Sequence, residues 1–182
     1  MKKIKVFLTA LLSVTVVFGA TIPVHAASSD VKIEVQATSM DNVSVTVPTS
    51  IPIVFNADGS NTLPTNWTIE NVSTIAGIHL SQIDMNAENS QWKLLADSVN
   101  VKTLSADTKS IKFSVGKTGA MKLVVPTSGT ESATGMVTFA DSEISIPSGE
   151  SQILSFDVER GAFTNAEASS KAFNMVLTFN FN

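Results

Sequence analysis

Apolar and polar residues alternate one by one along most of this 182-residue chain. Near its start, Val31, Ile33 and Val35 are separated by charged residues. Successive side chains of a β-strand point to opposite faces, so a period of two predicts strands that bury one face. Those faces must pack against another layer, because a single sheet would leave them in water. The alternation therefore predicts an all-β protein built from packed sheets.

The same pattern predicts about ten or eleven strands. They cover residues 31–35, 43–47, 51–55, 67–72, 75–85, 91–95, 111–115, 121–125, 136–139, 153–158 and 173–181. Turn residues separate them, as in Pro126-Thr127-Ser128-Gly129 and Pro147-Ser148-Gly149, where proline pre-sets φ and glycine supplies positive φ. Short strands at this spacing predict an antiparallel β-sandwich of jelly-roll or Greek-key type.

Three segments lack the alternation. Residues 165–172 have the composition of a helical turn, with a loop as the alternative. The Ser/Thr/Gly-rich residues 127–135 predict a flexible loop, and residues 27–30 predict a disordered tail. Helices and strands do not alternate along the chain, which argues against a parallel α/β fold.

The first 26 residues have the pattern of a secretory signal peptide. A lysine cluster at residues 2–5 precedes an apolar run at 6–18, and Val24-His25-Ala26 places small residues at the cleavage site. The apolar run is shorter than the roughly 20 residues that a membrane-spanning helix needs. We expect cleavage after Ala26 and a secreted protein, extracellular or associated with the cell wall, without a membrane anchor.

Residues 27–182 have the length of one domain. We therefore divide the chain into the leader 1–26, an N-terminal tail or donor strand at 27–38, and a single sandwich domain at 39–182. The leader holds three of the 12 Lys+Arg residues and none of the 16 Asp+Glu residues, so the mature chain carries a net charge of −7. Such a chain offers few cations to phosphates, which argues against nucleic acid as a partner. With no cysteine, it has no disulfide or thiolate metal site.

No residue pattern indicates a catalytic, cofactor or metal site, so we expect a protein that is not an enzyme. His79, the one histidine outside the leader, is expected on the surface of a strand, because a His-based zinc site or a Ser-His nucleophile would have to be built from this one imidazole. Residues 56–61 group side-chain oxygens around Gly59 as a calcium loop does, yet lack its distal glutamate. A hairpin turn is the preferred interpretation, and a weak calcium site is the alternative.

The sequence is also compatible with glycan hydrolysis and with an intramolecular isopeptide bond. A pair of carboxylates could hydrolyse a glycan, although nothing marks any two of them. The candidates are Asp84, Glu88, Asp97, Asp107, Asp141, Glu143, Asp157 and Glu159. Lysine and Asn or Asp side chains on adjacent strands could also form an isopeptide bond, which would replace the missing disulfides.

The two tryptophans are expected in the core. Trp67 shares a strand face with Ile69, and Trp92 shares one with Leu94. Because both neighbours on those faces are aliphatic, packing is favoured over a role as a ligand platform.

The chain resembles the WxL cell-surface domain of Gram-positive bacteria. The similarity rests on the signal peptide, Val45-Thr46-Val47-Pro48, Trp92-Lys93-Leu94 and the final strand 175–181. WxL domains normally carry a second Trp-x-Leu near the C-terminus, where this chain has Phe179-Asn180-Phe181. The resemblance implies non-covalent binding to the cell wall, with Trp92 and Leu94 as the matching positions. The implied partners are peptidoglycan, another wall polymer or other surface proteins, and no cofactor is implied.

In architecture the chain also resembles the jelly-roll subunits of biofilm matrix fibres, which lend an N-terminal strand to a neighbouring subunit. Residues 31–37 would suit that role, since strand addition needs a free edge and pockets for alternate side chains. We therefore expect a wall-associated surface protein. A fibre subunit that self-associates by strand exchange and a secreted glycan-binding or glycan-hydrolysing domain are the alternatives.

Overall fold

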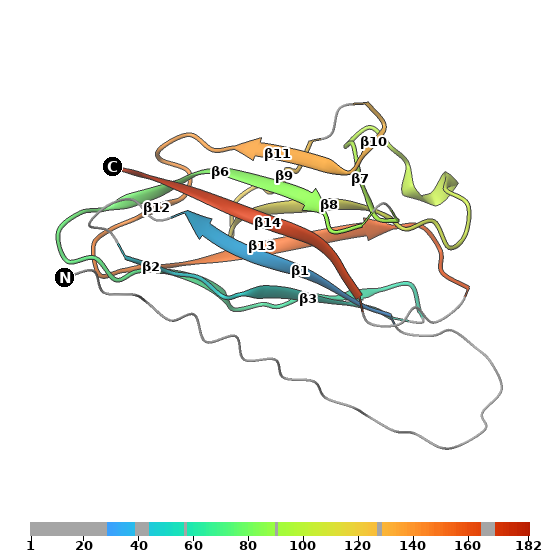
Figure 1. Ribbon diagram of the computed structural model, residues 1–182, viewed down its shortest axis with the longest axis horizontal. Coiled ribbons are helices and arrows are strands. Elements are labelled where there is room, and N and C mark those ends of the chain that lie inside the picture. The colour runs from blue at the N-terminus through green and yellow to red at the C-terminus, as the bar shows by residue number, and fades with distance from the viewer. Residues whose placement is uncertain (1–28, 39–43, 57, 90, 127–128, 165–169) are drawn as a thin grey trace, which may run out of the picture.

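The computed structural model describes residues 29–38, 44–56, 58–89, 91–126, 129–164 and 170–182. In these ranges the chain forms fourteen strands, which make two sheets packed face to face (Figure 1). The leader predicted at residues 1–26 lies outside the described residues. Across the ranges given above, no helix has the length and apolar character needed to cross a membrane.

Sheet A is the layer that contains both the first and the last strand. Its strand order is β11 (Thr134–Thr138), β6 (Ile78–Ala87), β14 (Ser170–Phe181), β1 (Ser29–Thr38), β3 (Ser50–Phe55) and β4 (Asn61–Thr62), and β12 (Ser145–Ile146) also pairs with β6.

Sheet B packs against it. Its order is β10 (Glu131–Ser132), β7 (Lys93–Leu95), β8 (Ser110–Lys117), β13 (Ser151–Arg160), β5 (Trp67–Asn71) and β2 (Val45–Thr46), and β9 (Leu123–Val124) also pairs with β8. One 3-10 turn, η1 (Val101–Thr103), lies between β7 and β8.

The all-β sandwich predicted from the alternation is confirmed. Most strand pairs are antiparallel, and the described pairings include two parallel ones, β1 with β14 and β7 with β8. The structure has fourteen strands rather than ten because several are too short to show a period of two. β4, β10 and β12, which the pattern missed, have two residues each.

Aromatic and aliphatic side chains from both sheets fill the space between them. Trp92 is 1% exposed, and its ring lies 6.2 Å from that of Phe55 and 6.3 Å from that of Phe173. Trp67 is 3% exposed and meets Phe156 edge-on at 5.5 Å. The prediction that both tryptophans belong to the core is confirmed.

Strand pairing extends into segments that the sequence assigned to other states. Ser29 and Asp30, placed in a disordered tail, belong to β1 because β3 pairs with them. The predicted flexible loop 127–135 contains β10 and the start of β11, and residues 127–128 lie outside the described residues. Residues 170–172, assigned to a helical turn or loop, begin β14, while 165–169 are not described. In each case a distant strand supplies the hydrogen bonds that local composition cannot reveal.

Candidate functional site: the β1 strand and its groove

β1 is a central strand of sheet A although it is the first strand of the chain (Figure 1). It runs parallel to β14 over Val31 to Thr38 and antiparallel to β3 over Ser29 to Glu34. If β1 left, sheet A would split into β11-β6-β14 on one side and β3-β4 on the other. The edges of β14 and β3 would then lack their partner strand.

The inner face of β1 is apolar and fully packed. Val31, Ile33 and Val35 are 1%, 0% and 7% exposed. Burial of such a side chain stabilises a fold by about 1.5–3 kcal/mol. The groove that β1 fills between β14 and β3 therefore binds a strand of this pattern favourably. The backbone N–H and C=O groups of β14 and β3 that face β1 also favour a partner strand, because burying such groups without a hydrogen bond costs free energy.

The outer face of β1 is held by a cluster of charged side chains. Lys171 Nζ lies 2.6 Å from Glu34 Oε2 on β1 and 3.3 Å from Glu88 Oε2, next to the end of β6. Asn174 donates its side-chain amide to Glu88. The hydrogen bond to Glu34, then the one to Glu88, raises the pKa of Lys171, and the Asn174 amide followed by Lys171 lowers the pKa of Glu88.

The free sides of β3 and β11 are protected at particular positions. At the free side of β3, Pro52 has no N–H to offer, and the Ser50 carbonyl accepts a hydrogen bond from Trp67 Nε1 at 3.1 Å. At the free side of β11, Met136 N donates to the carbonyl of Pro126 at 3.3 Å. The remaining ends of the sheet paths, at β2, β4 and β10, are two residues long.

Gly135 is what lets Pro126 approach β11. A Cβ atom at Gly135 would lie 2.7 Å from the Pro126 carbonyl and 2.8 Å from side-chain carbons of Leu94 and Val125. Any larger residue would push the Val125-Pro126 segment away from the edge.

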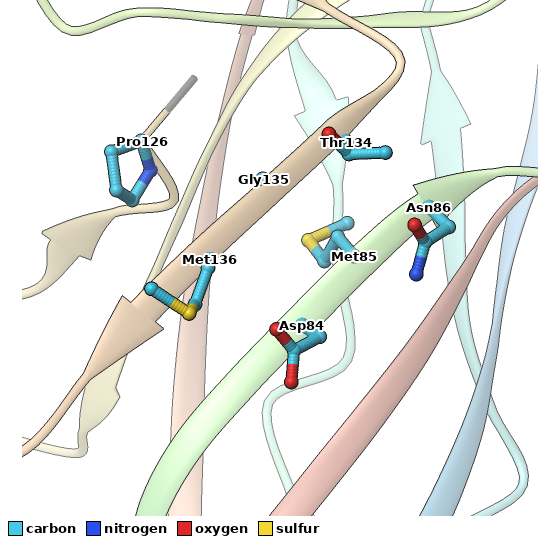
Figure 2. A pocket seen from close by; sticks show the side chains of 7 residues that line it. All are labelled: Asp84, Met85, Asn86, Pro126, Thr134, Gly135 and Met136. Carbon is cyan, nitrogen blue, oxygen red and sulfur yellow. The ribbon is translucent and has the colours of Figure 1, made fainter. Parts of the chain in front are cut away.

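A shallow pocket of about 390 Å³ lies at the same place (Figure 2). It is lined by Asp84, Met85, Asn86, Pro126, Thr134, Gly135 and Met136. Asp84 is its single titratable residue, and the Asp84 carboxylate accepts a hydrogen bond from Gln82 at 2.6 Å. The pocket therefore presents neither a second acid or base nor an aromatic platform for a sugar ring.

The residues that matched the WxL pattern are part of the core. Trp92 is 1% exposed and Leu94 is 0% exposed. Their side chains therefore fill the space between the sheets and do not meet the solvent.

His79 contradicts the prediction of a surface position, since it is only 4% exposed. β12 pairs with β6 at this residue. Its Nδ1 lies 3.1 Å from Asn182 Oδ1, and its Nε2 lies 3.1 Å from Asp141 Oδ1. Across the parts of the chain that are described, no three His, Cys, Asp or Glu side chains group as metal ligands do.

The carboxylates considered for glycan hydrolysis each hold a structural contact. Their partners are Gln82 for Asp84, Asn174 and Lys171 for Glu88, Lys112 for both Asp97 and Glu159, Thr164 for Asp107, His79 for Asp141, the Ala140 N–H for Glu143 and Lys122 for Asp157. Each of these eight side chains therefore has a local structural explanation.

β3 and β4 pair as a hairpin, and the described residues of its turn, 56 and 58–61, join them as the sequence favoured. Two of its oxygens, the Asn56 carbonyl and Asn61 Oδ1, accept hydrogen bonds from Arg160 at 3.0 Å. Both oxygens are thus engaged by the guanidinium of Arg160.

Lysine side chains meet acidic side chains on neighbouring segments at Lys112 and at Lys171. Lys112 Nζ lies 3.7 Å from both Asp97 Oδ1 and Glu159 Oε2. The two acidic side chains are 82% and 58% exposed, and the Lys112 side chain is 9% exposed.

No family model matches this chain, and no curated protein matches it in sequence. The site is therefore defined by its geometry. Sequence reasoning singled out the β1 segment through its alternation but missed Lys171, because that residue lies in a segment whose local composition indicates a helical turn.

Proposed function

We propose that this chain is a secreted, non-enzymatic structural subunit that self-associates at the cell surface by exchanging β1 between copies. One observation carries the proposal: the first strand of the chain occupies the centre of a sheet that is incomplete without it. In an exchanged assembly, β1 of one copy fills the groove between β14 and β3 of the next.

Exchange conserves nearly all of the energy that holds β1. The same backbone ladders and the same buried Val31, Ile33 and Val35 contacts form whether the strand comes from its own chain or from a neighbour. Swapping identical elements is therefore a low-cost route to association. The expected cleavage after Ala26 would leave β1 at the leading end of the mature chain, where it can withdraw without pulling another element.

The protected edges favour exchange over simple edge addition. Pro52 and the Trp67 hydrogen bond protect β3, and the Pro126 carbonyl covers β11. A second copy finds little free edge on a folded subunit, so the groove of β1 is the site at which strand addition has most to gain.

The first test is size-exclusion chromatography with light scattering on residues 27–182, with and without residues 27–38. We expect large assemblies from the full mature chain and none from the shortened chain. Because the shortened chain lacks a core strand, a peptide of residues 29–38 supplied in trans should restore its compact fold. A full-length protein that stays monomeric and sediments with purified peptidoglycan would overturn exchange and favour direct wall binding.

A cross-link test reports the origin of β1 directly, since the chain has no cysteine. Val35 N donates to Thr49 O, so the adjacent pair Glu34 and Ser50 is a non-hydrogen-bonded pair on the outer face. Such pairs have Cα atoms about 4.5 Å apart, which a disulfide can span. Oxidised E34C/S50C protein should run as a covalent ladder on a non-reducing gel. A product that is entirely monomeric would contradict exchange.

A further inference from the structure

The period of two by itself leaves the register of β1 ambiguous. A slip by one residue would turn Val31, Ile33 and Val35 toward solvent and is strongly disfavoured. A slip by two residues returns apolar side chains to the inner face and costs much less. Something other than the period of two must therefore select the observed register.

The outer face holds the feature that can select it. Among the outward residues of β1, Lys32, Glu34 and Gln36, only Glu34 can pair with Lys171. A slip by two residues would place either Lys32 or Gln36 where Glu34 now lies. The first would put a cation in place of that carboxylate, although Lys32 is already the Cα partner of Lys171 in the native register, and the second would put a neutral amide there. Either slip would leave Lys171 without the carboxylate from β1.

The receiving side of this contact does not depend on β1. Glu88 is held by the Asn174 amide, and Glu88 lies 3.3 Å from Lys171 Nζ. Lys171 and Asn174 lie on β14, and Glu88 directly follows β6, so all three remain on the acceptor subunit when β1 leaves. Lys171 is thus positioned toward the groove by its own subunit.

Resting on the function proposed above, we infer that Lys171 selects the incoming strand, so that the groove takes β1 of a second copy in the native register. The strand it accepts carries a carboxylate between two buried apolar positions, as Glu34 stands between Ile33 and Val35. Strands with the same apolar pattern but a cation or an amide at that position bind in slipped registers or are left out.

Three cysteine pairs report the register while leaving Glu34 and Lys171 intact. K32C/P52C joins residues that face each other in the native register. K32C/S50C and Q36C/S50C join residues that face each other only after a slip of two residues, in one direction or the other. The three reporters are to be oxidised in the otherwise unchanged chain, in K171E, in K171E with E34K, and in the control K102E.

We expect the native reporter alone to cross-link in the unchanged chain and in K102E, which makes the same charge change at the exposed Lys102. In K171E the slipped reporters should gain roughly two- to fivefold, the range typical of a cross-strand charge pair. The charge-swapped K171E/E34K chain should return to the native pattern. Mixed E34K and K171E subunits should also assemble together better than either does alone.

The outcomes separate the two proposals. The position of the cross-link reports the register, and the size of the product reports whether β1 comes from another copy. The role of Lys171 would be overturned if covalent ladders form but the yield of the two slipped cross-links is the same with and without K171E. It would also be overturned if K171E/E34K does not return to the native pattern. Exchange of β1 would remain supported in both cases. Products confined to monomers would overturn exchange and, with it, selection of a strand from a second copy.

Discussion

The indole Nε1 of Trp67 donates a hydrogen bond to the backbone carbonyl of Ser50, 3.1 Å away. Trp67 lies on β5 of sheet B and Ser50 on β3 of sheet A, so the bond ties the two layers together. It also occupies an outward carbonyl on the strand next to β1. One residue thus fills the core and closes an edge.

Replacing Trp67 with phenylalanine should separate these two roles. The W67F ring can still meet Phe156, but the Ser50 carbonyl loses its donor. We expect a loss of about 1–2 kcal/mol in the free energy of unfolding, from the missing hydrogen bond and the smaller ring. Urea titration followed by circular dichroism measures it. The exposed neighbour T65A is the control, and equal stability of W67F and wild type would contradict the role of this bond.

Asn71 is a buried polar residue that holds a loop. It is 0% exposed, and its side-chain amide donates to the carbonyls of Ala76, Ile146 and Pro147 at 2.9, 3.1 and 3.2 Å. N71A should destabilise the protein by about 2–4 kcal/mol, because buried carbonyls lose their donor. N66A, the same change at an exposed position, should stay within about 0.5 kcal/mol of wild type. Similar urea midpoints for N71A and N66A would sink this prediction.

Arg160 joins the β3–β4 hairpin to the end of β13 through both charge and shape. Its guanidinium lies 4.8 Å from the ring centre of Phe55 and 5.3 Å from that of Phe163, and partial burial lowers its pKa. R160K keeps the charge but loses the planar fork, so we expect about 1–2 kcal/mol of destabilisation. The measurement is thermal unfolding beside K102R, an exposed change of the reverse kind. An unchanged melting temperature for R160K would contradict it.

Much of this fold follows from the alternation of residues, because a strand with one buried face has apolar and polar residues in alternation. β13 and β14 were both anticipated for that reason. The alternation could not reveal two-residue strands such as β12, nor the contacts of His79 with Asn182 and Asp141. It also could not show that β1 pairs with β14, since that contact joins the two ends of the chain. The candidate site depends on this pairing and so needed the three-dimensional structure.

The cluster around Lys171 should make the anchoring of β1 depend on pH at both extremes. The pKa of Glu88 is lowered from its ordinary value of 4.5, so its contribution is present above that value and is lost as the pH falls through the folded-state pKa. The pKa of Lys171 is raised from 10.5, so its contribution is present below 10.5 and is lost as the pH rises through the folded-state pKa.

The measurement compares urea midpoints of wild type and K171M across the pH range. Wild type should be the more stable of the two between about pH 5 and pH 10, with the difference shrinking toward zero outside that window. The difference should also shrink in high salt, because the cluster is exposed. A difference that persists unchanged at pH 2 would show that Lys171 acts through packing and not through its charge.

Trp92, the residue that matches a wall-binding motif, packs in the core. Its ring contacts Phe55, Phe163 and Phe173 in the core, so its influence on any surface property must pass through stability. W92A should cost about 3–5 kcal/mol, whereas W92F should cost less because an aromatic ring remains. At temperatures where W92F stays folded, its assembly and any retention on peptidoglycan should equal those of wild type. If W92F stays folded but selectively loses retention on peptidoglycan, then Trp92 reaches the ligand and the core is not its only role.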